Sequence, residues 1–170
     1  NTQQLAVAIV RGAFEYQGQK CSAASRAYIP KEIWNETLDY IKGMIPQIKM
    51  GSSMGLSNFM NSVIDEKSFD TIVSYVERAK QSDKAEIVIG GNSDKSVGYF
   101  IEPTIIVTTD PQYETMTTEL FGPVITIYLY DADKYEETLA LCDSTSPYAL
   151  TGSIFAHSRY DIDTAMQALR

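Results

Sequence analysis

The sequence predicts an α/β fold in which a mostly parallel sheet carries helices on both of its faces. Short runs rich in β-branched and aromatic residues alternate along the chain with amphipathic helical patterns. Such alternation is typical of parallel strands joined by helices. With 170 residues, of which 44% are hydrophobic and 21% are charged, the chain is large enough to bury one core. We therefore expect residues 1–170 to form a single domain.

The expected helices each place apolar residues three or four positions apart on one face. Glycine readily adopts a left-handed conformation, so Gly18 should end the first helix. Pro30 suits the first turn of the second helix, and Pro46 should end or kink that helix. Asp65 and Asp133 are the expected N-caps of the third and fourth helices. The apolar faces comprise Leu5, Ile9, Ala13 and Tyr16; Trp34, Leu38, Ile41, Ile45 and Ile48; Phe69, Ile72, Val73 and Val76; Tyr135, Leu139 and Cys142; and, from Asp161, Ile162, Ala165, Met166 and Leu169.

The expected strands are short apolar or alternating runs. Proline cannot donate to a sheet ladder, so Pro103 indicates an edge position or a bulge in the third strand. Gly90 and Gly91 mark a turn after the second strand. Residues 51–58 are rich in glycine and serine but lack the spacing of a phosphate-binding loop, and we interpret them as a connector. The strand-like runs span residues 24–29, 85–89, 99–107, 124–130 and 150–156.

The charge balance and the cysteine count narrow the possible function classes. A net charge of −8 without clustered Lys and Arg argues against nucleic acid as a partner. No apolar run approaches the ~20 residues of a membrane helix, so we expect no membrane association. One histidine and two separated cysteines offer no metal-ligand spacing, so we expect no metal. Without a disulfide framework, the default is reduced thiols and an intracellular compartment.

Cys21 is the best candidate for chemistry. It follows Gly18 on a loop with polar neighbours, and the adjacent Lys20 favours the nucleophilic thiolate. Two general tendencies oppose this interpretation, because free cysteines are commonly buried as small hydrophobes and the C-terminus of a helix raises a thiol pKa. The residues alone leave both interpretations open. Cys142 lies on the apolar face of the fourth helix and is expected to be structural.

Three further residues have both a functional and a structural interpretation. Trp34 lies on an apolar stripe and is expected in the core rather than in a stacking site. Glu119 precedes a predicted strand, where an exposed loop charge is the simplest interpretation. His157 is the only histidine, so a cysteine–histidine hydrolase would have to use it as its base. Its position between a strand and a helix instead indicates a loop that faces solvent.

Two motifs resemble those of the aldehyde dehydrogenase superfamily. Phe14, Gly18-Gln19 and Cys21 are similar to the active-site cysteine segment, and residues 119–124 (Glu-Leu-Phe-Gly-Pro-Val) are similar to the cofactor-side motif. The two motifs follow one another in the family's order. Further segments, spread over nearly the whole chain, resemble the delta-1-pyrroline-5-carboxylate dehydrogenase branch: Phe14-Glu15-Tyr16, Ser62-Val63-Ile64-Asp65, Lys67-Ser68-Phe69, Gly98-Tyr99-Phe100, Asp133-Lys134-Tyr135 and Asp143-Ser144-Thr145.

The resemblance implies an NAD-dependent aldehyde dehydrogenase with a Rossmann-like catalytic domain. In this family the cysteine, here Cys21, adds to an aldehyde to give a thiohemiacetal, loss of hydride gives a thioester, and water releases the acid. The branch implies that L-glutamate γ-semialdehyde is oxidised to L-glutamate in proline catabolism. It also implies that Ser22 contacts the substrate carboxylate, Glu119 binds the nicotinamide ribose hydroxyls, and Phe121 packs against that end of NAD.

Two alternatives stay open, namely another aldehyde substrate and a noncatalytic association module that keeps the fold. The sequence contains no match to the family's cofactor-binding loop, general-base glutamate or oxyanion asparagine. We therefore expect residues 1–170 to be the nucleophile-bearing domain of a longer protein, without the cofactor-binding domain, and to fold without turning over aldehyde. We further expect a homo-oligomeric parent protein, located in the cytoplasm or, alternatively, in the mitochondrial matrix.

Overall fold

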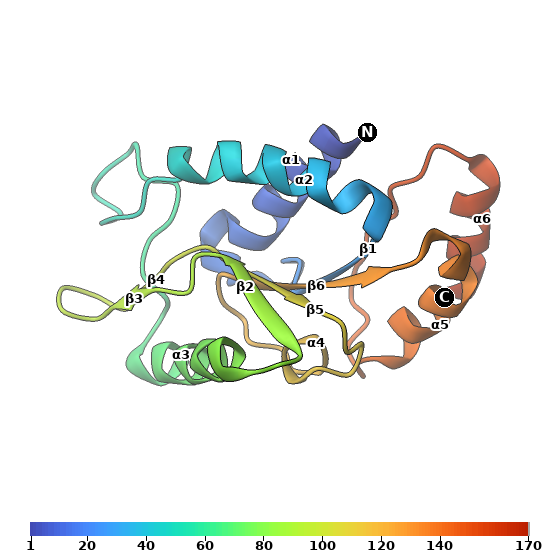
Figure 1. Ribbon diagram of the computed structural model, residues 1–170. Coiled ribbons are helices and arrows are strands. Elements are labelled where there is room, and N and C mark those ends of the chain that lie inside the picture. The colour runs from blue at the N-terminus through green and yellow to red at the C-terminus, as the bar shows by residue number, and fades with distance from the viewer. Residues whose placement is uncertain (170) are drawn as a thin grey trace.

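The computed structural model describes residues 1–169 and contains a four-stranded sheet in the order β1-β6-β5-β2 (Figure 1). The strands β1 (Arg26–Pro30) and β5 (Thr104–Thr108) run parallel to β6 (Val124–Tyr130), which lies between them. The edge strand β2 (Ala85–Ile89) runs antiparallel to β5. The predicted mostly parallel α/β sheet is therefore confirmed.

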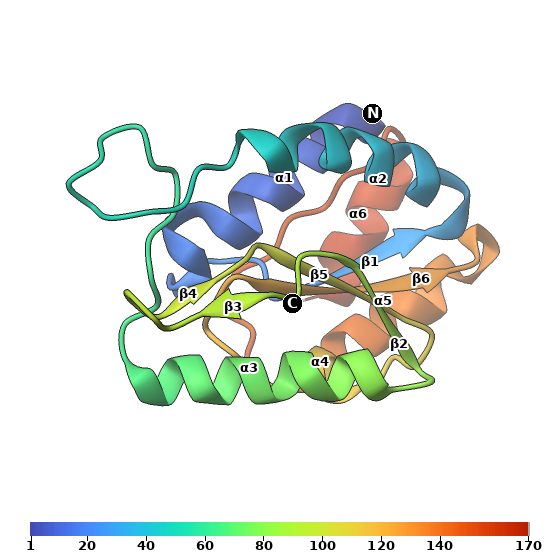
Figure 2. The same cartoon turned by 60° about the vertical axis from the view of Figure 1, so that its left-hand side comes forward.

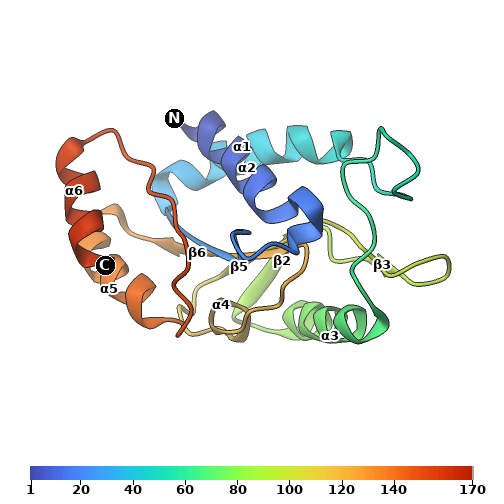
Figure 3. The same ribbon diagram turned by 180° about the vertical axis from the view of Figure 1, so that it is seen from behind.

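The helices and the smaller elements connect these strands. The helices are α1 (Thr2–Phe14), α2 (Lys31–Met44), α3 (Glu66–Gln81), α4 (Glu114–Thr117), α5 (Tyr135–Ser144) and α6 (Arg159–Ala168), the 3-10 turns are η1 (Glu15–Gly18), η2 (Ile45–Gln47) and η3 (Ala132–Lys134), and a small hairpin is formed by β3 (Ser93–Asp94) and β4 (Phe100–Ile101). Figure 1 shows α1 and α2 on one face of the sheet and α3 and α4 on the other. Figure 3 shows α5 and α6 together beside one end of the sheet.

Among residues 1–169, no helix has both the length and the apolar character needed to cross a membrane.

The sheet separates two apolar clusters because successive side chains of a strand point to opposite faces. In β5, Ile105 packs into the cluster under α1 and α2, whereas Ile106 packs into the cluster over α3. Ile125 and Ile127 of β6 are fully buried on the α1 and α2 side. An interior strand that is buried on both faces explains why β6 reads as a nearly continuous hydrophobic run.

Several local predictions are confirmed. Asp65 caps α3, since its carboxylate accepts a hydrogen bond from the Ser68 N–H at 2.8 Å. That hydrogen bond lowers the pKa of Asp65. The helix α2 ends at Met44, and Pro46 lies in the 3-10 turn that follows. Trp34 is only 6% exposed and belongs to the core.

The starts and faces of other helices differ from the prediction. Tyr16 lies beyond the end of α1 in a left-handed conformation, so its side chain is 64% exposed rather than on the buried face. Pro30 is the last residue of β1 and precedes α2 instead of lying in its first turn. Asp133 belongs to the separate turn η3 and does not cap α5. The helix α6 begins at Arg159 rather than at Asp161, and Ser158 caps it, because the Ser158 hydroxyl accepts from the Asp161 N–H at 3.3 Å.

Two of the predicted strands are wrong. The run 99–107 is divided at Pro103 into β4 and the interior strand β5, so Pro103 lies outside the ladder rather than at an edge or bulge. Residues 150–156 form no strand, and Leu150 and Phe155 are 72% and 55% exposed. A strand is stabilised by its ladder partners, and within residues 1–169 this segment has none.

Candidate active site

The loop that carries Cys21 begins with an unusual backbone conformation. Tyr16, Gln17 and Gly18 have φ values of 55°, 57° and 66°, so the chain leaves α1 through consecutive left-handed residues. A turn follows, in which the Ala23 N–H donates to the Lys20 carbonyl at 3.0 Å. Cys21 lies in this turn and is exposed, which favours the reactive-thiol interpretation over the buried one.

Gly18 brings this loop against the loop that precedes β6. A Cβ atom added at Gly18 would lie 2.3 Å from the Gly122 carbonyl oxygen and 2.7 Å from the Ala13 carbonyl oxygen. Only a residue without a side chain permits that approach. The two sequence motifs, separated along the chain, therefore meet backbone to backbone at Gly18 and Gly122.

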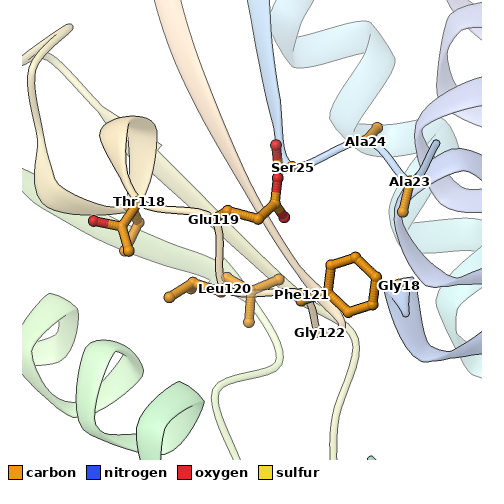
Figure 4. A pocket seen from close by; sticks show the side chains of 11 residues that line it. Gly18, Ala23, Ala24, Ser25, Thr118, Glu119, Leu120, Phe121 and Gly122 are labelled. Carbon is orange, nitrogen blue, oxygen red and sulfur yellow. The ribbon is translucent and has the colours of Figure 1, made fainter. Parts of the chain in front are cut away.

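A small pocket lies where the two motifs meet (Figure 4). Figure 4 shows the Glu119 side chain extending toward Ser25, and the Phe121 ring at the Gly18 end of the pocket. Phe121 has a φ of 55° and is 47% exposed, so its ring is presented to the surface rather than to the core. Glu119 is exposed. Cys21 and Ser22 lie on the same loop as Gly18, both exposed, but do not line this pocket.

Lys20, the cation next to Cys21, forms an ion pair with Glu15. The Lys20 ammonium donates to Glu15 at 2.8 Å, and Glu15 also accepts from Arg11 at 2.8 Å. The hydrogen bond from Lys20, together with the charge of Arg11, lowers the pKa of Glu15. Lys20 thus ties the Cys21 loop to the end of α1, a role that the sequence interpretation did not foresee.

Cys142 differs from Cys21 in its surroundings. It lies on α5, where burial raises the pKa of its thiol. A protonated and partly buried thiol is a poor nucleophile. The predicted division between a reactive and a structural cysteine is consistent with these positions.

Iodoacetamide near neutral pH is expected to label Cys21 before Cys142. The exposed thiol of Cys21 is accessible, whereas Cys142 is half-buried and its thiol pKa is raised by burial. Peptide mass spectrometry at successive times measures both rates. Urea-unfolded protein is the control, in which the two cysteines should react alike. Equal labelling rates in the folded protein would contradict the assignment.

His157 is not placed to serve Cys21. Its Nε2 atom lies 3.1 Å from the N-terminal amine of Asn1, at the start of α1. Cys21 follows the opposite end of that helix, which has 13 residues and is therefore roughly 20 Å long. His157 and Cys21 therefore do not form a cysteine–histidine pair.

Within residues 1–169, no three His, Cys, Asp or Glu side chains are grouped to hold a metal ion.

Gln17, four residues before Cys21, is a buried polar residue that sequence reasoning missed. Its side chain is 7% exposed and makes hydrogen bonds to the backbone of Asn61 and Ser62. The apolar periodicity of the first predicted helix did not indicate it, because Gln17 is polar and follows Tyr16, the last residue of that pattern. The available signal was its position one residue before Gly18, the glycine expected to end the first helix, although α1 in fact ends at Phe14 and Gly18 is the last residue of η1.

The whole chain is similar to known aldehyde dehydrogenases. The model of the aldehyde dehydrogenase family matches residues 1–170. The mitochondrial delta-1-pyrroline-5-carboxylate dehydrogenase of Dictyostelium discoideum is 56% identical over 161 residues, and that of Danio rerio is 48% identical over 162 residues. Each alignment covers 95% of this chain and 29% of the relative. The chain thus spans less than a third of the length of these curated relatives.

The fold is also similar to the solved structures of delta-1-pyrroline-5-carboxylate dehydrogenases. The Mycobacterium tuberculosis delta-pyrroline-5-carboxylate dehydrogenase bound with NAD has a TM-score of 0.90 and 37% identity, covering 99% of this chain and 30% of that one. A Thermus 1-pyrroline-5-carboxylate dehydrogenase with bound NAD has a TM-score of 0.89 and 26% identity, covering 99% and 32%.

Proposed function

Since this chain belongs to the aldehyde dehydrogenase family, we propose that it is the nucleophile-bearing catalytic domain of an NAD-dependent dehydrogenase that oxidises L-glutamate γ-semialdehyde to L-glutamate in proline catabolism. One observation carries the proposal: Gly18 and Gly122 join the Cys21 loop to the loop of Glu119 and Phe121 at a single pocket. The names of the most similar relatives support the substrate.

Cys21 is the proposed nucleophile. Its sulfur adds to the aldehyde carbon and forms a thiohemiacetal, whose oxyanion accepts a hydrogen bond from the Cys21 N–H. Loss of hydride from that carbon gives a thioester, and addition of water releases the carboxylic acid and restores the thiol. The exposed position of Cys21 leaves room for an aldehyde to approach the sulfur.

Ser22 is the proposed contact for the substrate carboxylate. It is adjacent to Cys21 and exposed, and its hydroxyl is able to donate a hydrogen bond to a carboxylate oxygen. Such a contact would favour an aldehyde that carries a carboxylate over a simple aliphatic aldehyde, because a charged acceptor strengthens the hydrogen bond.

NAD is the proposed cofactor, and Glu119 and Phe121 suit its nicotinamide end. The exposed Glu119 carboxylate is able to accept hydrogen bonds from ribose hydroxyls, and the exposed ring of Phe121 offers an apolar surface. When bound, NAD supplies the hydride acceptor. We assign the thioester-hydrolysing base and the adenosine contacts to none of the residues 1–169.

The compartment and the partners follow from the same proposal. The names of several relatives place those proteins in mitochondria, which favours the mitochondrial matrix over the cytoplasm for this protein. Its proposed partners are a small aldehyde and other copies of the full-length protein. Neither nucleic acid nor a membrane is required by the proposed chemistry.

The test is NADH production by the full-length protein with NAD and L-glutamate γ-semialdehyde. We expect a higher kcat/KM for this substrate than for propanal, which lacks the carboxylate that Ser22 would contact. Greater efficiency with propanal would show that the substrate is another aldehyde. Absence of NADH with every aldehyde tested would favour a noncatalytic association module.

Glu119→Gln in the full-length protein is expected to slow hydride transfer about tenfold, because a neutral amide is a weaker acceptor for ribose hydroxyls than a carboxylate. Single-turnover NADH formation measures the step. Glu36→Gln is the matched control, since Glu36 is an exposed glutamate on α2. Equal rates for the Glu119 variant and the wild type would return Glu119 to the role of an exposed loop charge.

A further inference from the structure

We propose that Gln17 is a positioning residue, whose buried side chain holds the Cys21 loop in its reactive conformation. This inference rests on the proposed function of Cys21. Its starting point is the backbone at Tyr16, Gln17 and Gly18, which is left-handed at each residue. Residues with a Cβ adopt this conformation at a cost, and it persists where surrounding contacts enforce it.

Gln17 provides such contacts from both ends of its amide group. Its Nε2 atom donates to the Ser62 carbonyl at 3.3 Å, and its Oε1 atom accepts from the Asn61 N–H at 2.9 Å. The Gln17 side chain is 7% exposed, so its amide group is largely withdrawn from water, and the two bonds are partly buried. Leaving either backbone group unpaired in such a place is costly. Gln17 therefore fixes a strained backbone to the chain segment 61–62.

The segment that receives Gln17 is itself fixed. Met60 and Val63, on either side of it, are 1% and 2% exposed. The Val63 N–H donates to the Tyr99 carbonyl at 2.9 Å, and Met60 pairs with Met50 in an isolated bridge. Figure 2 shows this part of the chain between α2 and α3 passing beside the end of α1. A well-anchored segment gives Gln17 a rigid support.

A second tie lies on the other side of Gly18. The Ile64 N–H donates to the Gln19 Oε1 atom at 2.8 Å. Gln17 and Gln19 therefore bind neighbouring residues of one stretch, 61–64, and the left-handed Gly18 lies between them. Cys21 follows two residues after the second tie. Because catalysis depends on placing the sulfur within a fraction of an ångström, loss of the buried tie should impair chemistry more than substrate binding.

The test begins with Gln17→Met in the full-length protein, because methionine fills a similar volume and forms neither hydrogen bond. We expect kcat to fall about tenfold, while KM for the aldehyde changes less than about twofold. Thr138→Val is the matched control. It removes the hydrogen bond of a buried hydroxyl at the start of α5, from Thr138 to the Lys134 carbonyl at 2.8 Å, and should leave kcat unchanged.

Gln17→Glu adds a second measurement, the pH dependence of kcat, which a merely structural role of Gln17 would leave unchanged. A protonated carboxyl group has the shape of the amide and is able both to accept from Asn61 and to donate to Ser62, whereas the carboxylate only accepts. Burial favours the protonated form of a carboxyl group. The ratio of variant to wild-type kcat should therefore rise as the pH is lowered.

The outcomes separate this inference from the proposed function. If Cys21→Ala is inactive while Gln17→Met keeps the wild-type kcat, the positioning role is wrong and the proposed function stands. If Thr138→Val loses kcat as Gln17→Met does, the effect is one of general stability and the positioning role is also wrong. A ratio for Gln17→Glu that is independent of pH overturns it even if Gln17→Met fails to fold. Full activity of Cys21→Ala would instead refute the proposed function.

Discussion

Alanine in place of Cys21 is expected to reduce aldehyde oxidation by the full-length protein at least about a thousandfold, because without the sulfur no thiohemiacetal forms and hydride has no comparable route out of the aldehyde. The exposed Cys21 contributes little to the core, so the melting temperature should stay near the wild-type value. NADH absorbance measures the loss.

Cys142→Ala is the control for this experiment. Cys142 is half-buried on α5, so the change removes a thiol without touching the Cys21 loop. We expect it to retain most of the activity. Activity of Cys21→Ala within about tenfold of the wild type would show that the chemistry does not depend on this sulfur.

Alanine at Gly18 is expected to have the second largest effect and to act on the fold of the site. The left-handed φ of 66° disfavours a residue with a side chain, and the new Cβ would lie 2.3 Å from the Gly122 carbonyl oxygen. Left-handed strain costs about 1–2 kcal/mol and overpacking about 1–3 kcal/mol. We therefore expect a lower melting temperature and a large loss of activity, measured by thermal unfolding and NADH production.

Gly43→Ala supplies the matched control. Gly43 lies in α2, and apart from its chain neighbours and the nearby backbone of that helix no atom lies within 4 Å of an added Cβ, so alanine there should be neutral or stabilise by about 0.5–1 kcal/mol. If Gly18→Ala and Gly43→Ala unfold at the same temperature, the close approach of the two motif loops is not what shapes the site.

Local signals explain the parts of the fold that could be predicted from the sequence. Asp65 caps α3 because the cap uses an N–H only three residues away, and Pro46 ends α2 through its own ring. The failures depend on distant partners. Residues 150–156 alternate like a strand, but sequence does not reveal whether a neighbouring strand exists, and Pro103 divides a run that looked continuous.

In the candidate site, too, the residues within short motifs could be predicted from the sequence, whereas the contacts between distant segments could not. Cys21, Ser22, Glu119 and Phe121 could be proposed because short motifs resemble a known family. The contact that joins those motifs, between Gly18 and Gly122, depends on the tertiary fold and has no local signature. The hydrogen bonds of Gln17 bridge more than forty residues of chain, so neither spacing nor propensity could reveal them.

The most direct test of Cys21 as the nucleophile is to capture the covalent intermediate. The full-length protein is mixed with NAD and L-glutamate γ-semialdehyde, quenched in acid within the first turnover, digested, and analysed by mass spectrometry. The thioester chemistry predicts a glutamyl group on the peptide that contains Cys21, formed together with the first equivalent of NADH. NADH formation with the Cys21 peptide unmodified, or with the glutamyl group on Cys142, would contradict it.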